Sequence, residues 1–190
     1  RAEGGYNYNG KNVKLIDLPG TYSLLSTSTD EEVARNFILF GRPDVTVIVV
    51  DASRLERNLN LVLQVLEITD KAVLCLNLMD EAKRHHISVD ERALSKRLGI
   101  PVIPASARSG EGIPELIQTI HQVAVGEIKC KPHRIKITSK QVNEAIEELS
   151  QKLKAKYPDL PNTRWIAMRL LDGDKHIIDA LKNGEFLIAS

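Results

Sequence analysis

Asp17-Leu18-Pro19-Gly20 is the first of three short motifs in this 190-residue sequence whose side chains could do chemistry. The carboxylate of Asp17 is suited to orienting a metal-bound water, and a glycine at position 20 lets a backbone N–H approach a terminal phosphate closely. On its own this spacing is weak evidence, because Asp-x-x-Gly recurs by chance in chains of ordinary composition. A plain turn is the alternative interpretation.

Asn77-Leu78-Met79-Asp80 is the second motif. A carboxylate at this point can accept two hydrogen bonds from the N1 and N2 edge of guanine, which favours guanine over adenine. The asparagine can contact the base and hold neighbouring loops together. The alternative is that this segment only caps a helix.

Ser106-Ala107 is the third motif and the weakest by itself. A small residue here would let the backbone N–H of Ala107 reach a carbonyl acceptor such as guanine O6. The three motifs gain weight from their order, because each of them follows a predicted strand.

The elements that must position these motifs alternate between strand and helix from residue 13 to residue 125. Asn9-Gly10 between two alternating runs predicts an antiparallel hairpin over about 5–17. Residues 45–50 are apolar or β-branched without alternation, as expected for a strand that is covered on both faces. The other expected elements are strands at 72–76 and 101–103 and helices at 30–40, 54–69, 88–98 and 113–125, with capping boxes at Thr29/Glu32 and Ser88/Glu91.

This alternation predicts a doubly wound α/β sheet, in which ligands bind where the carboxyl ends of the strands meet the loops. The pattern changes near residues 126–133. Beyond it, amphipathic segments at 139–157, 164–171 and 175–181 predict a small all-α appendage. We therefore expect two domains, at 1–126 and 127–190.

The order of the three motifs resembles the later half of the guanine-nucleotide-binding set of P-loop GTPases. The likeness is more specific than that. The GTPase domain of the bacterial ferrous iron transport protein B family is resembled by five parts of the chain: residues 17–23, 30–35, 50–52 with 55–59, 77–82 and 110–113. Residues 133–135, 157–158 and 164–174 resemble that family's helical, GDI-like domain, so the resemblance covers essentially the whole chain.

The resemblance implies a cytoplasmic switch domain that binds GTP and GDP with Mg²⁺, hydrolyses GTP and regulates Fe(II) uptake. Its partner would be the transmembrane transporter domain of the same protein, on the cytoplasmic face of the bacterial inner membrane; a homo-oligomer is left open. The helical domain would favour the GDP-bound form and relay the nucleotide state toward the membrane. We expect that domain to continue past Ser190.

Individual roles carry over onto the matching positions. Asp17 would reach magnesium through water, the Gly20 N–H would meet the γ-phosphate, and residues 20 to about 36 would form the second switch. Asn77 and Asp80 would read guanine, with Ser106 and Ala107 supporting the base. There are two departures: Leu78 stands where many GTPases have a lysine over the base, which implies modest affinity, and Thr21 stands where Ras-like enzymes have a water-orienting glutamine, which implies slow turnover.

No G-x-x-x-x-G-K-[ST] phosphate loop occurs in the sequence, and the threonine of the first switch is not located. No catalytic residue is therefore assigned. The resemblance places the strand before that loop between the strands at 13–16 and 45–50. We accordingly expect unpaired edges on these two strands, and residues upstream of Arg1 that complete the domain.

The composition narrows the alternatives. The net charge is +1, from 26 basic and 25 acidic residues, which gives no electrostatic reason to expect a nucleic-acid partner. No apolar run is long enough to span a bilayer, the N-terminus does not resemble a secretory signal, and two cysteines point to a reducing compartment. A binding-only regulatory fragment without GTPase activity and an RNA-associated GTPase remain the alternative functions.

For three further residue sets we favour a structural role over a functional one. His85-His86 is expected in a solvated loop rather than at a metal, since adjacent histidines do not share a helix face. Asp51 is expected to cap the loop after its strand, and Cys75 to pack in a buried strand.

Overall fold

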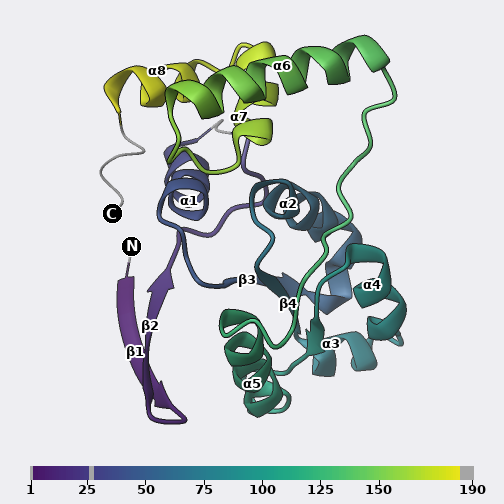
Figure 1. Ribbon diagram of the computed structural model, residues 1–190. Coiled ribbons are helices and arrows are strands. Elements are labelled where there is room, and N and C mark those ends of the chain that lie inside the picture. Colours follow the sequence, from purple (N-terminus) through teal and green to yellow (C-terminus); the bar gives the residue numbers. More distant parts are fainter. Residues whose placement is uncertain (1, 26–27, 185–190) are drawn as a thin grey trace.

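Two separate β-sheets make up the strand content of the computed structural model, which describes residues 2–25 and 28–184. β1 (Ala2–Tyr8) and β2 (Lys11–Asp17) form an antiparallel hairpin, and its turn places Asn9 and Gly10 at φ of 49° and 76°. β3 (Thr46–Asp51), β4 (Ala72–Asn77) and β5 (Val102–Pro104) form a parallel sheet in that order (Figure 1). The predicted hairpin and parallel sheet are confirmed.

Helices cover both faces of the parallel sheet, as a doubly wound fold requires. Along β4, Leu74 and Leu76 belong to one buried cluster and Val73 and Cys75 to another, because successive side chains point to opposite faces. The first cluster includes α2 (Leu55–Ile68) and α4 (Glu91–Leu98), and the second includes α5 (Ile113–Ala124). The remaining elements before residue 126 are α1 (Thr29–Phe40), the 3₁₀ turn η1 (Ala52–Arg54) and α3 (Met79–Arg84).

β3 differs from the expectation that both of its faces are covered. Ile48 and Val50 are buried, but Val49 is 59% exposed. Among the described strands, β3 pairs only with β4, and β2 pairs only with β1. Both strands therefore present an unpaired edge within the described residues, as we expected for these two strands.

The two predicted capping boxes lie one or two residues away from the actual caps. Ser28 caps α1, where its Oγ accepts the N–H of Glu31, so the box built on Thr29 is wrong. Asp90 caps α4 and accepts the N–H of Ala93, in place of Ser88. In each case the side chain that can reach the free N–H groups of the first turn decides the start.

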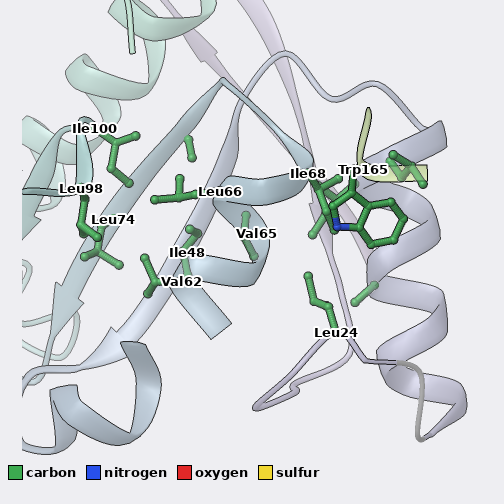
Figure 2. Close-up of a cluster of buried hydrophobic side chains, with 14 of the residues drawn as sticks. Leu24, Ile48, Val62, Val65, Leu66, Ile68, Leu74, Leu98, Ile100 and Trp165 are labelled. Atoms are coloured by element: carbon green, nitrogen blue, oxygen red, sulfur yellow. The ribbon is translucent and has the colours of Figure 1, made fainter. Parts of the chain in front are cut away.

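The C-terminal segments are helical, as predicted: α6 (Lys140–Lys156), α7 (Thr163–Leu171) and α8 (Lys175–Asn183). We call α6 to α8 the helical unit. It lies over α1 and α2 (Figure 1) and shares their buried cluster, to which it contributes Ile146, Trp165, Ile166 and Ile177. Figure 2 shows Trp165 beside Ile68 in this cluster. One continuous apolar core thus joins the two parts of the chain.

Polar contacts fasten the helical unit and residues 127–139, which we call the connector, to the sheet domain. The side-chain N–H₂ of Asn162 donates to the carbonyls of Glu67 and Ile68, each at 2.8 Å, at the end of α2. The connector donates from Lys131 N to Gly99 O at 2.8 Å. A Cβ on residue 99 would lie 1.9 Å from the Lys131 carbonyl oxygen, so only glycine permits this approach.

A buried ion network joins α1 to the helical unit. The Arg35 side chain, 1% exposed, lies 3.6 Å from Asp174 Oδ2, and Arg169 Nη2 lies 3.0 Å from the same oxygen. Asp174 also caps α8, because its Oδ1 accepts the N–H groups of His176 and Ile177. One carboxylate therefore serves two guanidinium groups and a helix start.

Burial, neighbouring charges and hydrogen bonds together set the pKa values of Arg35 and Asp174. Burial lowers the pKa of Arg35, and the charge of Asp174 opposes that shift. Burial by itself raises the pKa of Asp174, but the hydrogen bonds from Arg169 and the Ile177 N–H, together with the charge of Arg35, hold it below its usual value. Each charge is thus kept in place by the other.

We predict that Asp174→Asn lowers the free energy of unfolding by about 3–5 kcal/mol at neutral pH, because Arg35 is left buried without its counter-charge. Since the folded-state pKa of Asp174 lies below its unfolded value of about 3.9, its contribution is present above that pH and is lost as the pH falls through the folded pKa. Urea unfolding followed across acidic pH should therefore show a flatter pH dependence in the variant.

Asp172→Asn is the matched control. Asp172 is paired with Arg169 at 2.9 Å, but its side chain is 68% exposed, so its loss should leave the unfolding midpoint close to that of the wild type. Equal losses in the two variants would contradict the role given to the buried carboxylate.

Candidate functional site

The second and third motifs lie side by side at the carboxyl ends of β4 and β5. Asn77 Oδ1 accepts the N–H of Ala107 at 3.0 Å, and Ser106 Oγ accepts the N–H of Asp80 at 3.2 Å. A backbone bond from Met79 N to Ala105 O at 3.1 Å lies between them. Segments that are about 30 residues apart are thereby held as one loop cluster, which we call the base loop.

Ser106 is the buried centre of the base loop. It is 1% exposed, its N–H donates to the Glu111 carbonyl at 2.9 Å, and its own carbonyl accepts the N–H groups of Ser109 and Gly110. Its hydroxyl is small enough to fit there while still accepting a hydrogen bond from the Asp80 N–H. A serine at this position therefore fixes the start of α3 from the neighbouring strand.

Leu78 adopts a left-handed backbone conformation, with φ of 61° and ψ of 36°. This region is rare for a bulky residue and costs on the order of 1–3 kcal/mol. The turn lets Asn77 reach Ala107 while Asp80 enters the first turn of α3. The leucine side chain is 38% exposed beside the base loop, at the position where a lysine would cover a base in many GTPases.

The Asp80 carboxylate is accessible. Its side chain is 44% exposed and lies 3.6 Å from Arg84 Nη2, one turn along α3. Such an exposed pair is weak and competes little with a ligand that offers two donors. The Ala107 N–H, by contrast, is donated to Asn77 in this structure, so the expected bond to guanine O6 requires that donor to be shared or exchanged.

The first motif lies at the end of the separate hairpin. Asp17 is the last residue of β2 and is exposed, opposite Ala2 in the ladder. Leu18 packs against the main core, Pro19 is half-buried, and a Cβ on Gly20 would meet nothing within 4 Å.

Thr21 closes this segment locally, where its Oγ1 donates to the Ser23 carbonyl at 2.6 Å. Within the described ranges, no hydrogen bond or ion pair joins residues 17–21 to the base loop. The structure thus brings together the second and third motifs, but not the first.

Metal-binding groups are sparse. In residues 2–25 and 28–184, no cluster of three or more His, Cys, Asp or Glu side chains could hold a metal ion by itself. Magnesium at Asp17 would therefore depend on ligand oxygens supplied by the nucleotide and by water.

The structure has the three further residue sets at the loop, cap and core positions expected for them. His85 and His86 are exposed, Asp51 Oδ1 caps η1 by accepting the Ser53 N–H at 2.8 Å, and Cys75 is buried in β4. Burial raises the pKa of the Cys75 thiol, which agrees with a packing role.

Comparison with protein families shows where this chain belongs. The family model of ferrous iron transport protein B matches residues 1–120, and that of the FeoB cytosolic helical domain matches residues 139–189. The chain belongs to the ferrous iron transport protein B (FeoB) family. It is a mixed α/β G-domain followed by a helical domain, as the FeoB cytosolic structures are.

Curated FeoB relatives are much longer than this chain. The Fe(2+) transporter FeoB of Escherichia coli strain K12 is 39% identical over 178 residues, which are 92% of this chain and 22% of the transporter. A Porphyromonas gingivalis fusion of Fe(2+) transport protein A with FeoB is 38% identical over 179 residues, 92% of this chain and 21% of the fusion. The chain thus spans about a fifth of their length. No helix in the described residues has the length and apolar character needed to cross a membrane.

Solved FeoB structures share the fold. The cytosolic domain of Thermotoga maritima FeoB in its GMPPNP form aligns with a TM-score of 0.83 at 34% identity, covering 100% of this chain and 73% of that one. The cytosolic domain of Legionella pneumophila FeoB aligns with a TM-score of 0.81 at 31% identity, covering 98% and 72%.

We predict that Asn77→Ala speeds amide hydrogen exchange at Ala107, because the Ala107 N–H loses its acceptor. NMR-detected exchange of that single amide is the measurement. Asn77→Asp retains an acceptor oxygen and should preserve the protection of Ala107. Equal exchange in both variants would show that the side chain of residue 77 does not hold the loop.

Proposed function

We propose that this chain contributes the guanine-recognition part of a GTP-binding switch in a ferrous iron transporter. The observation that carries the proposal is the base loop, in which Asn77, Asp80, Ser106 and Ala107 meet at the carboxyl ends of β4 and β5. The accessible Asp80 carboxylate supplies the acceptor pair that matches guanine N1 and N2. The GMPPNP form of the T. maritima relative supports this nucleotide class.

GTP hydrolysis belongs to the proposal for the longer protein. Asp17 and Gly20 would serve the phosphate side, Asp17 through a water on Mg²⁺ and Gly20 through its N–H. Magnesium, when bound, would neutralise charge on the phosphates. Thr21 cannot place an attacking water as a glutamine does, because its side chain is short and is bonded to the Ser23 carbonyl, so intrinsic turnover would be slow.

The helical unit is proposed to read the state of the second switch. The proposed second switch, residues 20 to about 36, includes the first two turns of α1, and its residues 26–27 lie outside the described residues. α1 is tied to α8 by the buried Arg35–Asp174 pair and by the 3.2 Å contact of Glu32 Oε1 with His176 Nδ1. A shift of α1 would have to carry α8 with it or break a buried ion pair, which is costly. This linkage supports a relay toward the transmembrane transporter domain at the cytoplasmic face of the membrane.

A binding-only module is the second candidate for this chain taken by itself. Among the described strands, β2 and β3 do not pair with each other, so no sheet joins the first motif to the base loop. Base contacts alone would give weak binding, since the phosphates supply much of a nucleotide's charge. The family match over residues 139–189 favours both of these functions over an RNA-associated GTPase.

We predict that Asp80→Asn lowers the preference for guanine over adenine at least about tenfold, because an amide offers one donor and one acceptor where guanine needs two acceptors. Fluorescent GDP and ADP titrations measure the preference, both in this chain and in a longer family chain that carries the phosphate loop. Asp179→Asn, an exposed change on α8, is the control and should leave it unchanged.

The outcomes separate the candidates. GDP binding by the longer chain alone supports the switch, whereas equal affinity in both chains supports a binding-only module. Failure of the longer chain to prefer guanine, or an unchanged preference in Asp80→Asn, would overturn the role of the base loop.

A further inference from the structure

A cavity of about 360 Å³ lies at the junction of the connector, the end of α2, α6 and α7. It is large enough for a small ligand and shares no residue with the three motifs. Its polar lining is Glu67, Arg134, Lys136, Asn143 and Arg164, and Ile137 and Met168 contribute apolar wall. The connector passes beside α2 in this region before α6 begins (Figure 1).

Two of the cations, Arg164 and Arg134, each donate a hydrogen bond to a neutral acceptor. Arg164 Nη2 donates to Asn143 Oδ1 at 3.2 Å, and Asn143 Nδ2 donates in turn to the Ile137 carbonyl at 2.6 Å. Arg134 Nε donates to the Leu66 carbonyl at 3.0 Å. The guanidinium groups are therefore oriented before any ligand arrives, which reduces the entropy lost on binding.

The lining of the cavity carries more positive than negative charge. Arg134 pairs with Asp70 at 2.5 Å, but Lys136 and Arg164 have no carboxylate within ion-pair distance among the described residues. Glu67 is the single acidic side chain of the lining, and its Oε1 accepts the Ile135 N–H at 2.9 Å. A concave surface with uncompensated Arg and Lys side chains attracts anions, and phosphate oxygens match the guanidinium fork.

We propose that this cavity binds a phosphate monoester, with its phosphate on Arg164 and Lys136 and its organic part against Ile137 and Met168. Such a ligand would touch the connector, α6 and α7 at once. It would therefore stabilise the docking of the helical unit by binding the folded state alone.

An NMR titration tests the proposal on the whole chain at low ionic strength. Inorganic phosphate and phenyl phosphate are the soluble probes, and phosphatidic acid in phosphatidylcholine vesicles presents the same group as a lipid headgroup. We expect saturable shifts of the Ile137 and Asn143 amides in the millimolar range, with phenyl phosphate tighter than phosphate because of the apolar wall.

Single substitutions test whether the phosphate probes bind in this cavity. Arg164→Gln and Lys136→Gln should each weaken phenyl phosphate binding about five- to tenfold, whereas Glu67→Gln, which keeps an acceptor for the Ile135 N–H, should tighten it several-fold. Arg92→Gln, an exposed change on α4, is the matched control and should have no effect. The tightening by Glu67→Gln cannot arise from misfolding.

Each outcome of these titrations supports or overturns the proposed phosphate site. Saturable binding of the soluble esters that follows the variants supports a small-molecule site, and the same variant pattern with vesicles alone supports the headgroup as the source. Shifts that do not saturate, or affinities that all the variants share, would overturn the proposal. Because Asp80→Asn should leave these shifts intact, a failure of guanine recognition would not affect this result.

Discussion

The position of the helical unit depends on the burial of one charge, the guanidinium of Arg35. A cation with almost no access to water is tolerated only if a counter-charge and hydrogen bonds replace its hydration, and Asp174 supplies the former at 3.6 Å. Asp174 in turn is fixed because it also caps α8 and pairs with Arg169. The apolar core around Trp165 supplies most of the surface burial, whereas this network specifies which faces of α1 and α8 meet.

In the base loop, the uncharged polar side chains do not pair with charges as Arg35 and Asp174 do. They accept hydrogen bonds from backbone N–H groups of the neighbouring motif. Asn77 and Ser106 each bond across from one motif to the other, and the strained backbone of Leu78 makes this geometry reachable. The Asp80 carboxylate is left as the accessible acceptor. Strain is thus placed where a bound base would approach, and it is offset by the well-packed strands β4 and β5 beneath it.

Much of the fold followed from the sequence because apolar periodicity, Asn-Gly and Gly99 are local signals. The failures concern partners that lie far away in the chain. The run around Val49 is as apolar as a two-sided strand, yet the Val49 side chain is 59% exposed. Arg35 has the type of a surface residue, and its ion-pair partner Asp174 is remote in sequence, so its burial was not predicted. α3 was missed because it has six residues and little apolar periodicity.

For the site, the sequence predicted which strand ends carry the motifs and that Asn77 holds loops together, but not that Ala107 is its partner. The order in which the chain emerges during synthesis adds a further consequence of the α1–α8 contact. Glu32 and His176 are 144 residues apart, and the carboxylate that pairs with the buried Arg35 belongs to Asp174, on the same distant helix start. A nascent chain that has exposed α1 but not α8 lacks the Asp174 partner of this guanidinium, whereas β3 to β5 can assemble from closer neighbours. Completion of the helical unit is therefore the event that buries the face of α1 that carries Arg35.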